Sequence, residues 1–153
     1  MGLNSRIGDA IDILRGIERD WIEETTTELL ANTQRNTRVD HGQTKKSWDR
    51  QVIGNRGYVG SDYMNTVWEE FGTGHYGIGE LEHRQTPWYV PVEGYQGTKR
   101  PTFNGRVVIV RGKNGKSYYK TNGKQPQRTL YKTFKGYEKT ARKRLETLGG
   151  RLK

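Results

Sequence analysis

The sequence contains no cysteine and no long apolar run. Without cysteine the chain can form no disulfide and has no thiolate chemistry, which permits a cytosolic origin. The longest uninterrupted apolar run is the four residues Val107–Val110, and a membrane-spanning helix needs about 20. We therefore expect a soluble protein that does not contact a membrane and is not exported through a signal peptide.

Apolar residues are also scarce overall. They make up 31% of the 153 residues, and the mean hydropathy is −1.01, whereas soluble domains average roughly 45–50% apolar. A chain of this length and composition can build one domain with a modest core. Neighbours in an assembly would bury additional surface and stabilise it, which is a first indication of a structural subunit.

The charge is basic and uneven. The 27 basic and 17 acidic residues give a net charge of +10. Residues 1–31 carry three basic and seven acidic side chains (−4), residues 128–153 nine and two (+7), and residues 32–127 fifteen and eight (+7). A basic balance favours anionic partners such as nucleic acid, acidic protein surfaces or lipid head groups. The alternative is that the lysines simply keep a C-terminal helix soluble.

Hydrophobic spacing predicts a long helix at each end of the chain. The first begins at Asn4 or Ser5 and fades near Asn32, and the second follows residues 125–128 and stops at Gly149-Gly150. Each has an apolar stripe at spacings of three and four. The stripes are Ile7, Ile11, Leu14, Ile17, Trp21 and Leu29 in the first helix, and Leu130, Phe134, Tyr137, Ala141, Leu145 and Leu148 in the second. The period of the first stripe also suits packing against another helix, in the same chain or in a neighbour.

Between the helices the sequence predicts two hairpins and a short helix. Residues 47–53 and 58–61 read as antiparallel strands around the turn 55–57, and residues 63–71 as the helix. Residues 106–111 and 117–121 flank the Asn114-Gly115 turn, while 88–90 suit an edge strand or an extended loop. The fold class is therefore α+β, with a small antiparallel sheet of about four strands packed with the N-terminal and C-terminal helices.

Several sequence patterns resemble those of nucleotide-binding, metal-binding or catalytic sites, but none has the surrounding residues that such a site needs. Gly72–Gly77 fits G-x-G-x-x-G, yet a helical pattern precedes it and none follows, so no pyrophosphate site is expected. Adjacent carboxylates on a helix diverge by about 100° and form no catalytic dyad. The histidines lack metal-ligand spacing, and no serine has a nucleophile-elbow context. These candidates are His41, His75 and His83 with Glu80 and Glu82, the carboxylates of Asp62, Glu69 and Glu70, and the serines Ser47 and Ser61. We expect no enzyme, no cofactor and no metal.

Basic and aromatic residues alternate along the second hairpin, at Arg106, Arg111, Lys113, Lys116, Tyr118, Tyr119 and Lys120. Exposed aromatic side chains beside lysines can stack single-stranded bases. The alternative is that one face of the hairpin packs and the other is solvated. A nucleic-acid-binding protein would lose affinity as salt rises, with a slope near −0.9 per phosphate neutralised.

Two segments carry the clearest signal, Val39–Trp48 (VDHGQTKKSW) and Val59–Gly74 (VGSDYMNTVWEEFGTG). Together they resemble a family of minor structural proteins of long-tailed bacteriophages, found at the neck where head meets tail. The family's two hallmarks read V-D-T-G-x-L-x-x-S and G-S-x-x-Y-A-x-x-V-E-F-G-T-G. The resemblance runs from the first helix through Gly74 and resumes near Lys124. It implies a single neck-component domain over residues 1–153 with a variable excursion at 75–123.

The matched positions can be given residue by residue. Asp40 and Gly42 match the D-x-G turn, where Asp caps backbone amides and Gly permits a positive φ. Further matches are Ser47, Tyr63, Val67, Glu70, Phe71, Gly72, Thr73 and Gly74. The departures are His41 for Thr, Thr44 for Leu and Met64 for Ala, and Gln125–Leu130 is a weakened form of the family's proline-containing entry into its last helix.

The resemblance implies a non-enzymatic virion protein, made in the host cytoplasm and built into the neck or tail region. It implies a homo-oligomeric ring of six or twelve copies that joins the portal or head-closure proteins to the tail tube or tail terminator, with packaged DNA possible in its lumen. Two alternatives stay open, a tail-terminator ring and a free, sequence-nonspecific nucleic-acid-binding protein. On this hypothesis the acidic first helix and the basic last helix pair between neighbouring subunits.

Roles for individual residues follow from the same resemblance. Tyr63, Val67 and Phe71 would support the core beneath the motif helix. Glu70, Thr73 and Gly74 would be interface or loop-positioning residues, and Trp88 and Tyr89 would lie in an arm at 75–105 that orders on docking. Lys139, Arg142, Lys143 and Arg144 are candidates for electrostatic contact with DNA or with a neighbour.

Overall fold

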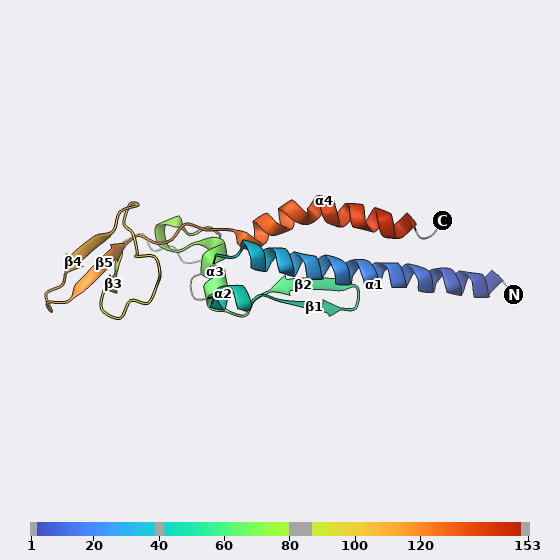
Figure 1. The fold of residues 1–153 in the computed structure, drawn as a ribbon, viewed down its shortest axis with the longest axis horizontal. Coiled ribbons are helices and arrows are strands. Elements are labelled where there is room, and N and C mark those ends of the chain that lie inside the picture. The colour runs from blue at the N-terminus through green and yellow to red at the C-terminus, as the bar shows by residue number, and fades with distance from the viewer. Residues whose placement is uncertain (1–2, 39–41, 80–86, 151–153) are drawn as a thin grey trace. The chain divides into compact units, whose positions relative to one another are not determined.

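The computed structural model describes residues 3–38, 42–79 and 87–150, and shows an α+β protein with a long helix at each end (Figure 1). The chain divides into two compact units. The first comprises residues 1–37, 45–61 and 130–153, and the second comprises 38–44 and 62–129. The four-residue helix α2 (Gln43–Lys46) lies where the chain passes from the second unit to the first.

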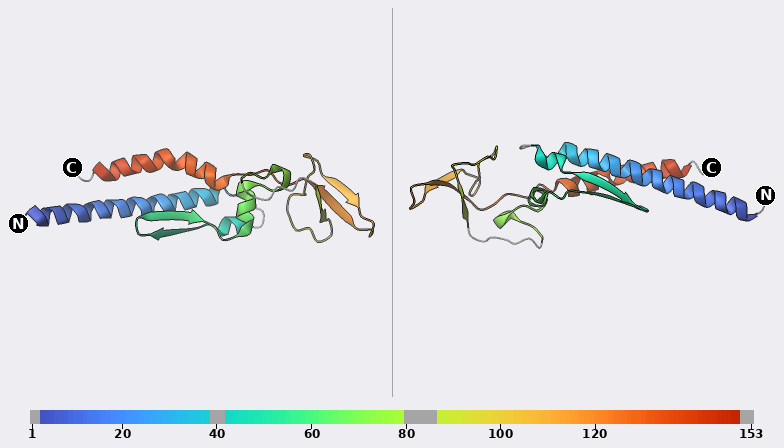
Figure 2. Two further views of the ribbon diagram at one scale, coloured as in Figure 1. Left: turned by 180° about the vertical axis from the view of Figure 1, so that it is seen from behind. Right: turned by 90° about the horizontal axis from the view of Figure 1, so that it is seen from below.

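Helix α1 (Leu3–Asn36) is the centre of the first unit. Helix α4 (Thr129–Gly149) lies along one side of it, and the hairpin of β1 (Asp49–Ile53) and β2 (Arg56–Gly60) lies along another (Figures 1 and 2). The two strands pair antiparallel, with Gln51 opposite Tyr58. The helices are antiparallel too, because Asn36 of α1 contacts Thr133 near the start of α4, whereas Trp21 contacts Ala141 further along it.

The side of α1 that faces the hairpin is built from threonine as much as from aliphatic residues. Its buried positions are Ile22, Thr26, Leu29 and Thr33, and Thr37 directly after the helix is buried as well. Each of the three threonine hydroxyls donates to the backbone carbonyl four residues earlier, at 2.7–2.8 Å. These bonds satisfy the hydroxyls locally, so that short side chains can line a buried surface without an unpaired polar group.

The hairpin approaches this threonine face very closely at Gly57. A Cβ at Gly57 would overlap Cγ2 of Thr26 and lie 3.2 Å from Cγ2 of Ile22. Trp48 closes one end of the contact, since its buried indole N–H donates to Thr37 Oγ1 at 2.8 Å. At the other side of the hairpin, Arg50 pairs with Glu23 at 2.7 Å. Thr26 and Gly57 thus allow the helix and the hairpin to approach each other closely at this point.

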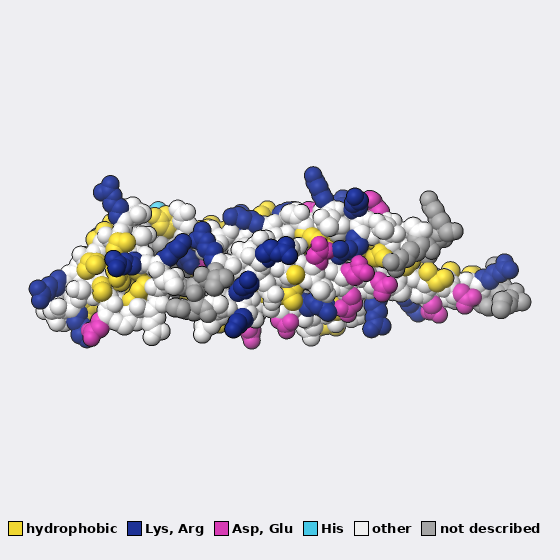
Figure 3. Space-filling model, viewed as in Figure 1, with side chains coloured by type: hydrophobic (Ala, Val, Ile, Leu, Met, Phe, Trp, Pro, Cys, Tyr) yellow, Lys and Arg dark blue, Asp and Glu magenta, His cyan; other side chains and the backbone are white. Residues whose placement is uncertain are grey.

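The second unit contains a three-stranded antiparallel sheet in the order β3-β5-β4. Its strands are β3 (Trp88–Pro91), β4 (Val108–Arg111) and β5 (Ser117–Thr121). Tyr119 on the central strand is buried opposite Val90 and Ile109, and the ring of Tyr95 packs edge-on against it. The outer surface remains apolar in places (Figure 3), with Tyr89 54% and Ile109 53% exposed.

Helix α3 (Met64–Phe71) and the 3-10 helix η1 (Gly74–Tyr76) complete the second unit. Thr66 is the buried residue of α3, and its hydroxyl donates to the carbonyl of Tyr63 at 2.7 Å. Met64, Trp68 and Phe71 are spaced four and three residues apart, so they share the opposite, exposed face. The helix is therefore amphipathic with its apolar face outward.

The predicted fold class and terminal helices are confirmed, but the single four-stranded sheet is wrong. The structure has two separate sheets, of two and three strands, because the hairpin 49–60 pairs only with itself and packs on α1. Residues 88–90, expected as an edge strand or an extended loop, lie in the edge strand β3 (Trp88–Pro91). Both predicted helical stripes are only partly buried, since Ile7, Ile11, Leu14, Phe134 and Leu145 are exposed. In the part of the chain that the structure describes, no helix is long and apolar enough to span a membrane.

We predict that Gly57→Ala lowers the free energy of unfolding by about 1–3 kcal/mol, because the new methyl group overlaps Thr26. Chemical denaturation followed by circular dichroism measures this. Gly60→Ala in the same strand is the matched control, since nothing lies within 4 Å of a Cβ there. Thr26→Ser removes Cγ2 and should rescue the Gly57→Ala variant. Equal effects of the two glycine substitutions would contradict the close contact.

Candidate functional site

The second motif ends in a junction between two segments that are distant in sequence. After α3, residues 72–75 run beside residues 122–127. The amide of Thr73 donates to the carbonyl of Lys124 and that of His75 to the carbonyl of Asn122, both at 2.9 Å. In return, the amide of Lys124 donates to the hydroxyl of Thr73 at 3.0 Å. Thr73 therefore joins the motif to the segment that leads into α4.

Gly72 and Gly74 make this close approach possible. Both have a positive φ, +75° and +59°, which L side chains rarely adopt. A Cβ at Gly72 would lie 2.8 Å from the carbonyl oxygen of Lys124, and one at Gly74 would lie 2.7 Å from that of Asn122. The two glycines of the E-F-G-T-G sequence are thus required by backbone contact within the chain.

Side chains and backbone on either side reinforce the junction. The carboxylate of Glu69 forms an ion pair with Lys124, and the backbone carbonyl of Glu69 accepts the amide of Gln127 at 2.8 Å. The ring of Trp88 lies against Gly74, where it would meet any added Cβ. Trp88, a predicted interface residue, therefore supports the motif loop from inside the unit. Tyr89 next to it is exposed.

The predicted core role of the motif helix needs correction. Tyr63 and Phe71 are 39% and 41% exposed, and Val67 is half-buried. The physical reason is that the eight-residue helix packs through the side that carries Thr66, which leaves its larger residues outside. Tyr63 precedes the helix, and its hydroxyl donates to Oε1 of Gln43 at 3.0 Å. Glu70 is half-buried.

The first motif is described only in part. Asp40 and His41 lie outside the described residues, as do Glu80, Glu82 and His83 of the considered metal set. Gly42 has a φ of +77°, in agreement with a turn that needs glycine. The hydroxyl of Ser47 accepts a hydrogen bond from Ser61 at 2.8 Å, which ties the segment before β1 to the end of β2.

The structure also shows the residues that were candidates for nucleotide binding, metal binding and base stacking. Residues 74–76 of the G-x-G-x-x-G match form a single 3-10 turn, so no helix of useful length starts there. Among residues 3–38, 42–79 and 87–150, no group of three or more His, Asp or Glu side chains is placed to hold a metal ion. On the second hairpin, Tyr119 is buried and the hydroxyl of Tyr118 accepts from Asn114. Tyr119 is therefore not available to stack a base.

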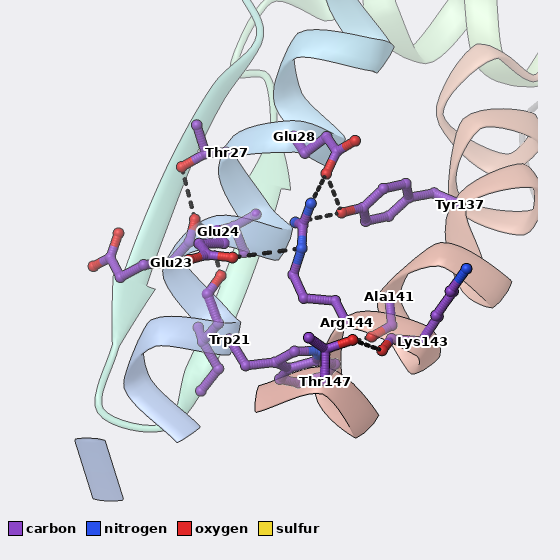
Figure 4. A network of polar contacts seen from close by, with 12 residues as sticks. Trp21, Glu23, Glu24, Thr27, Glu28, Tyr137, Ala141, Lys143, Arg144 and Thr147 are labelled. Carbon is purple, nitrogen blue, oxygen red and sulfur yellow. Dashed lines mark hydrogen bonds and ion pairs between the residues drawn. The ribbon is translucent and has the colours of Figure 1, made fainter. Parts of the chain in front are cut away.

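A polar cluster joins α1 to α4 in the first unit (Figure 4). The hydroxyl of Tyr137 donates to Oε2 of Glu28 at 2.6 Å and accepts from Nη1 of Arg144 at 2.8 Å. Arg144 also pairs with Glu28 directly and with Glu24 at 3.4 Å. The indole of Trp21 donates to the carbonyl of Ala141 at 2.9 Å. The acidic and basic helices thus pair within one chain.

The cluster shifts the pKa of each member in the direction that its contacts require. Hydrogen bonds from Tyr137 and Arg144 lower the pKa of Glu28, and the bond to Glu28 raises the pKa of Arg144. Burial, followed by the bond to Glu28, raises the pKa of Tyr137 from 10 to about 12. All three shifts favour the state in which Glu28 and Arg144 are charged and Tyr137 is neutral.

Arg144 is therefore separated from the other basic candidates on α4. Lys139 and Lys143 are exposed, and Arg142 is exposed but pairs with Glu138 on the same helix at 3.0 Å. At about 100° per residue, Lys132, Lys139 and Lys143 share one face, away from the face of Tyr137 and Leu148 that meets α1. This lysine face is the part of α4 that remains suited to an anionic partner.

Comparison with protein-family models, with curated proteins and with solved structures returns no match to this chain. The resemblance to phage neck proteins accordingly stays a prediction based on the two motifs.

Sequence reasoning missed three features of these sites. It did not identify the buried threonine face of α1, although the spacing 22, 26, 29, 33 and 37 is helical, because threonine does not count as apolar. It did not identify Gly57, whose role depends on an approach that no local pattern shows. It also assigned Arg144 to an outer surface, since six of the 21 residues of α4 are basic and the sequence does not show which one turns inward.

We predict that stability falls at alkaline pH through Tyr137. Because its pKa is raised on folding, its contribution is complete below pH 10 and is lost as the pH rises towards about 12. Denaturation at pH 8 and pH 11 should show a loss of about 1 kcal/mol that Tyr137→Phe abolishes. Tyr131→Phe, on an exposed residue of the same helix, is the control. An unchanged pH dependence in Tyr137→Phe would contradict the raised pKa.

A second prediction concerns the motif glycines. Gly72→Ala should destabilise the second unit by about 1–3 kcal/mol more than Gly79→Ala. Both positions have a positive φ, so both variants incur that strain, but only Gly72 is close to the Lys124 carbonyl. Hydrogen exchange at the amides of Thr73, His75 and Gln127 reports on the junction. Equal protection of these amides in the two variants would show that the junction does not depend on Gly72.

Proposed function

We propose that this chain is a non-enzymatic structural subunit that forms a ring at the joint between head and tail of a long-tailed bacteriophage. In this role it would contact portal or head-closure proteins on one side and the tail tube or tail terminator on the other. The motif resemblance supports the proposal, and so does the placement of the E-F-G-T-G sequence at a junction that holds two distant segments together.

The observation that carries the proposal is the balance of buried and exposed apolar side chains. Among the described residues, six large hydrophobic side chains are buried and sixteen are exposed. Some exposure is normal for a soluble protein, but contiguous apolar surface marks an interaction site. Some of the exposed residues share a helical face, as Met64, Trp68 and Phe71 do on α3. A subunit that is covered by neighbours would have this distribution.

The lysine face of α4 supports a contact with DNA or with an acidic neighbour. Lys132, Lys139 and Lys143 would meet phosphate without reading sequence. A free nucleic-acid-binding protein is the alternative that uses the same residues. The buried position of Tyr119 disfavours base stacking on the hairpin, and the salt dependence of DNA binding separates several phosphate contacts from none.

The test is electron microscopy of lysates from the encoding phage after interruption of the gene. DNA-filled heads beside complete, unattached tails are expected, because head and tail mature separately and fail to join. A plasmid copy of the wild-type gene should restore virions. Tails of uncontrolled length would replace the joining role with tail termination, and normal virions without the gene would overturn the structural role.

A further inference from the structure

One face of the β3-β5-β4 sheet is covered by the chain's own loop. Tyr119 and Thr121 of the central strand β5 are buried on this face. The ring of Tyr95 packs edge-on against Tyr119, with the ring centroids 5.4 Å apart. The hydroxyl of Thr121 donates to the carbonyl of Thr102 at 2.9 Å. Tyr95 and Thr102 belong to the segment between β3 and β4, which therefore lies against this face.

The opposite face carries an exposed aromatic ring beside a lysine. Because paired residues of antiparallel strands project on the same side of a sheet, this face holds two rows of side chains. The rows are Tyr89, Lys120 and Val108, followed by Pro91, Tyr118 and Val110. Tyr89 is 54% exposed, and the amine of Lys120 lies 4.1 Å from the centroid of the Phe103 ring. Tyr89 is therefore available on the face that Tyr119 does not reach.

The sheet and its loops carry positive charge that the chain itself does not neutralise. Residues 87–124 contain eight basic side chains and one acidic side chain, Glu93, hence +7. Lys124 pairs with Glu69 of α3. Within the part of the chain that the structure describes, none of the other seven forms an ion pair. The exposed members of this set are Lys99, Arg100, Arg106, Arg111, Lys113 and Lys116. Figure 3 shows Lys and Arg side chains among and around the apolar side chains of this sheet.

The cations lie at both ends of the strands. Arg106 precedes β4, where its backbone pairs with that of Phe103. Arg111, Lys113 and Lys116 lie at the other end, around the turn between β4 and β5. A strand of four or five residues is about 13–16 Å long. A polymer with regularly spaced negative charges can therefore meet cations on both sides of the point where it crosses the sheet.

This combination of groups suits single-stranded nucleic acid. Proteins bind single strands without sequence preference by stacking bases on aromatic side chains and by following the backbone with cations. A duplex keeps its bases paired and stacked on one another, so it would use the cations and leave Tyr89 without a partner. An acidic protein surface would be attracted to the same cations, but attraction to charge alone does not require an exposed ring between them. A single strand uses both features.

We propose that the open face of the β3-β5-β4 sheet binds single-stranded nucleic acid. One base stacks on Tyr89, and the neighbouring phosphates contact Lys120 and the cations at the two ends of the strands. Tyr89, from outside the second hairpin, thus has the stacking role from which burial excludes Tyr119. The site goes beyond the proposed function, because it requires neither a ring nor a neck and uses none of the lysine face of α4.

Fluorescence anisotropy of the full-length chain with labelled strands of about 15 nucleotides tests the stacking. One probe is oligothymidine, and the other has the same phosphates but only abasic sites. We expect Tyr89→Ala to weaken oligothymidine binding about tenfold, the loss of one stacked base, and to leave the abasic probe unchanged. Tyr89→Phe keeps the ring and should bind as the parent does. The matched control is Tyr58→Ala, on a 48% exposed tyrosine of β2, which should also bind as the parent does.

Several results with these probes would overturn the proposal. Absence of binding to oligothymidine, or equal affinity of the parent chain for the two probes, would exclude a stacking site. Equal losses in Tyr89→Ala and Tyr58→Ala would exclude Tyr89 as its centre. Displacement of oligothymidine by poly-glutamate at equal charge concentration would assign the face to acidic proteins instead.

A charge variant locates the phosphates. Lys113→Glu with Lys116→Glu changes two exposed lysines of the turn and should weaken binding of both probes. The slope of log affinity against log salt should fall by about 1.4, since each phosphate contact on a single strand contributes about 0.7. Lys45→Glu with Lys46→Glu makes the same charge change on exposed lysines of α2 and is the control. A loss with Lys139→Glu and Lys143→Glu, and none with the turn variant, would place the strand on α4 and overturn the proposal.

This proposal and the neck role can fail separately. Oligothymidine binding as expected, together with normal virions after gene interruption, would keep this site and remove the neck role. Unattached tails, together with no binding of oligothymidine, would keep the neck role and overturn this site.

Discussion

The contact between the threonine face of α1 and the β1-β2 hairpin is the constraint on which the first unit depends. A chain with few apolar residues cannot separate a helix from a sheet by a layer of leucine and phenylalanine. It brings the two backbones together instead, with Thr26 against Gly57. Dispersion contacts at short range replace buried apolar area, and each threonine hydroxyl is satisfied within its own helix.

The position of the hairpin determines which side of α1 is available to α4. Because the hairpin occupies the threonine face, α4 must lie on another side of α1, where the residues are Trp21, Glu24 and Glu28. Carboxylates on this side require cationic and hydroxyl partners, which Arg144 and Tyr137 provide. The two helices are therefore joined largely by a polar cluster. The contribution of this cluster to stability depends on every polar group in it having a hydrogen-bond partner. The shifts in pKa of Glu28 and Tyr137 are consequences of that requirement.

The sequence predicts the helices and strands well. It predicts less well which of them pack against one another. Periodicity places both terminal helices and both hairpins, because spacing is a local property. It does not separate the two sheets, since that depends on which surface the hairpin 49–60 meets. It also assigns Phe134 to a buried stripe, although Thr133 beside it is the buried residue. The resemblance singles out Gly72 and Gly74 in the sequence. The reason that glycine is needed at these positions is that the backbone of residues 122–126 lies against them, and this contact appears only in three dimensions.

The internal pairing of α1 with α4 changes how the charge asymmetry is understood. Net charge alone suggests that acidic and basic helices meet between subunits, yet Arg144 is already engaged with Glu24 and Glu28 in its own chain. What this internal pairing leaves exposed is the first turns of α1 and the outer sides of α4. The first turns of α1 are neutral, because Arg6 and Arg15 balance Asp9 and Asp12, so the acidic character of α1 belongs to residues 18–31, where Glu24 and Glu28 already pair with Arg144. The positive charge of α4 is different, because Lys132, Lys139 and Lys143 lie on a face turned away from α1 and stay exposed while Arg144 pairs internally.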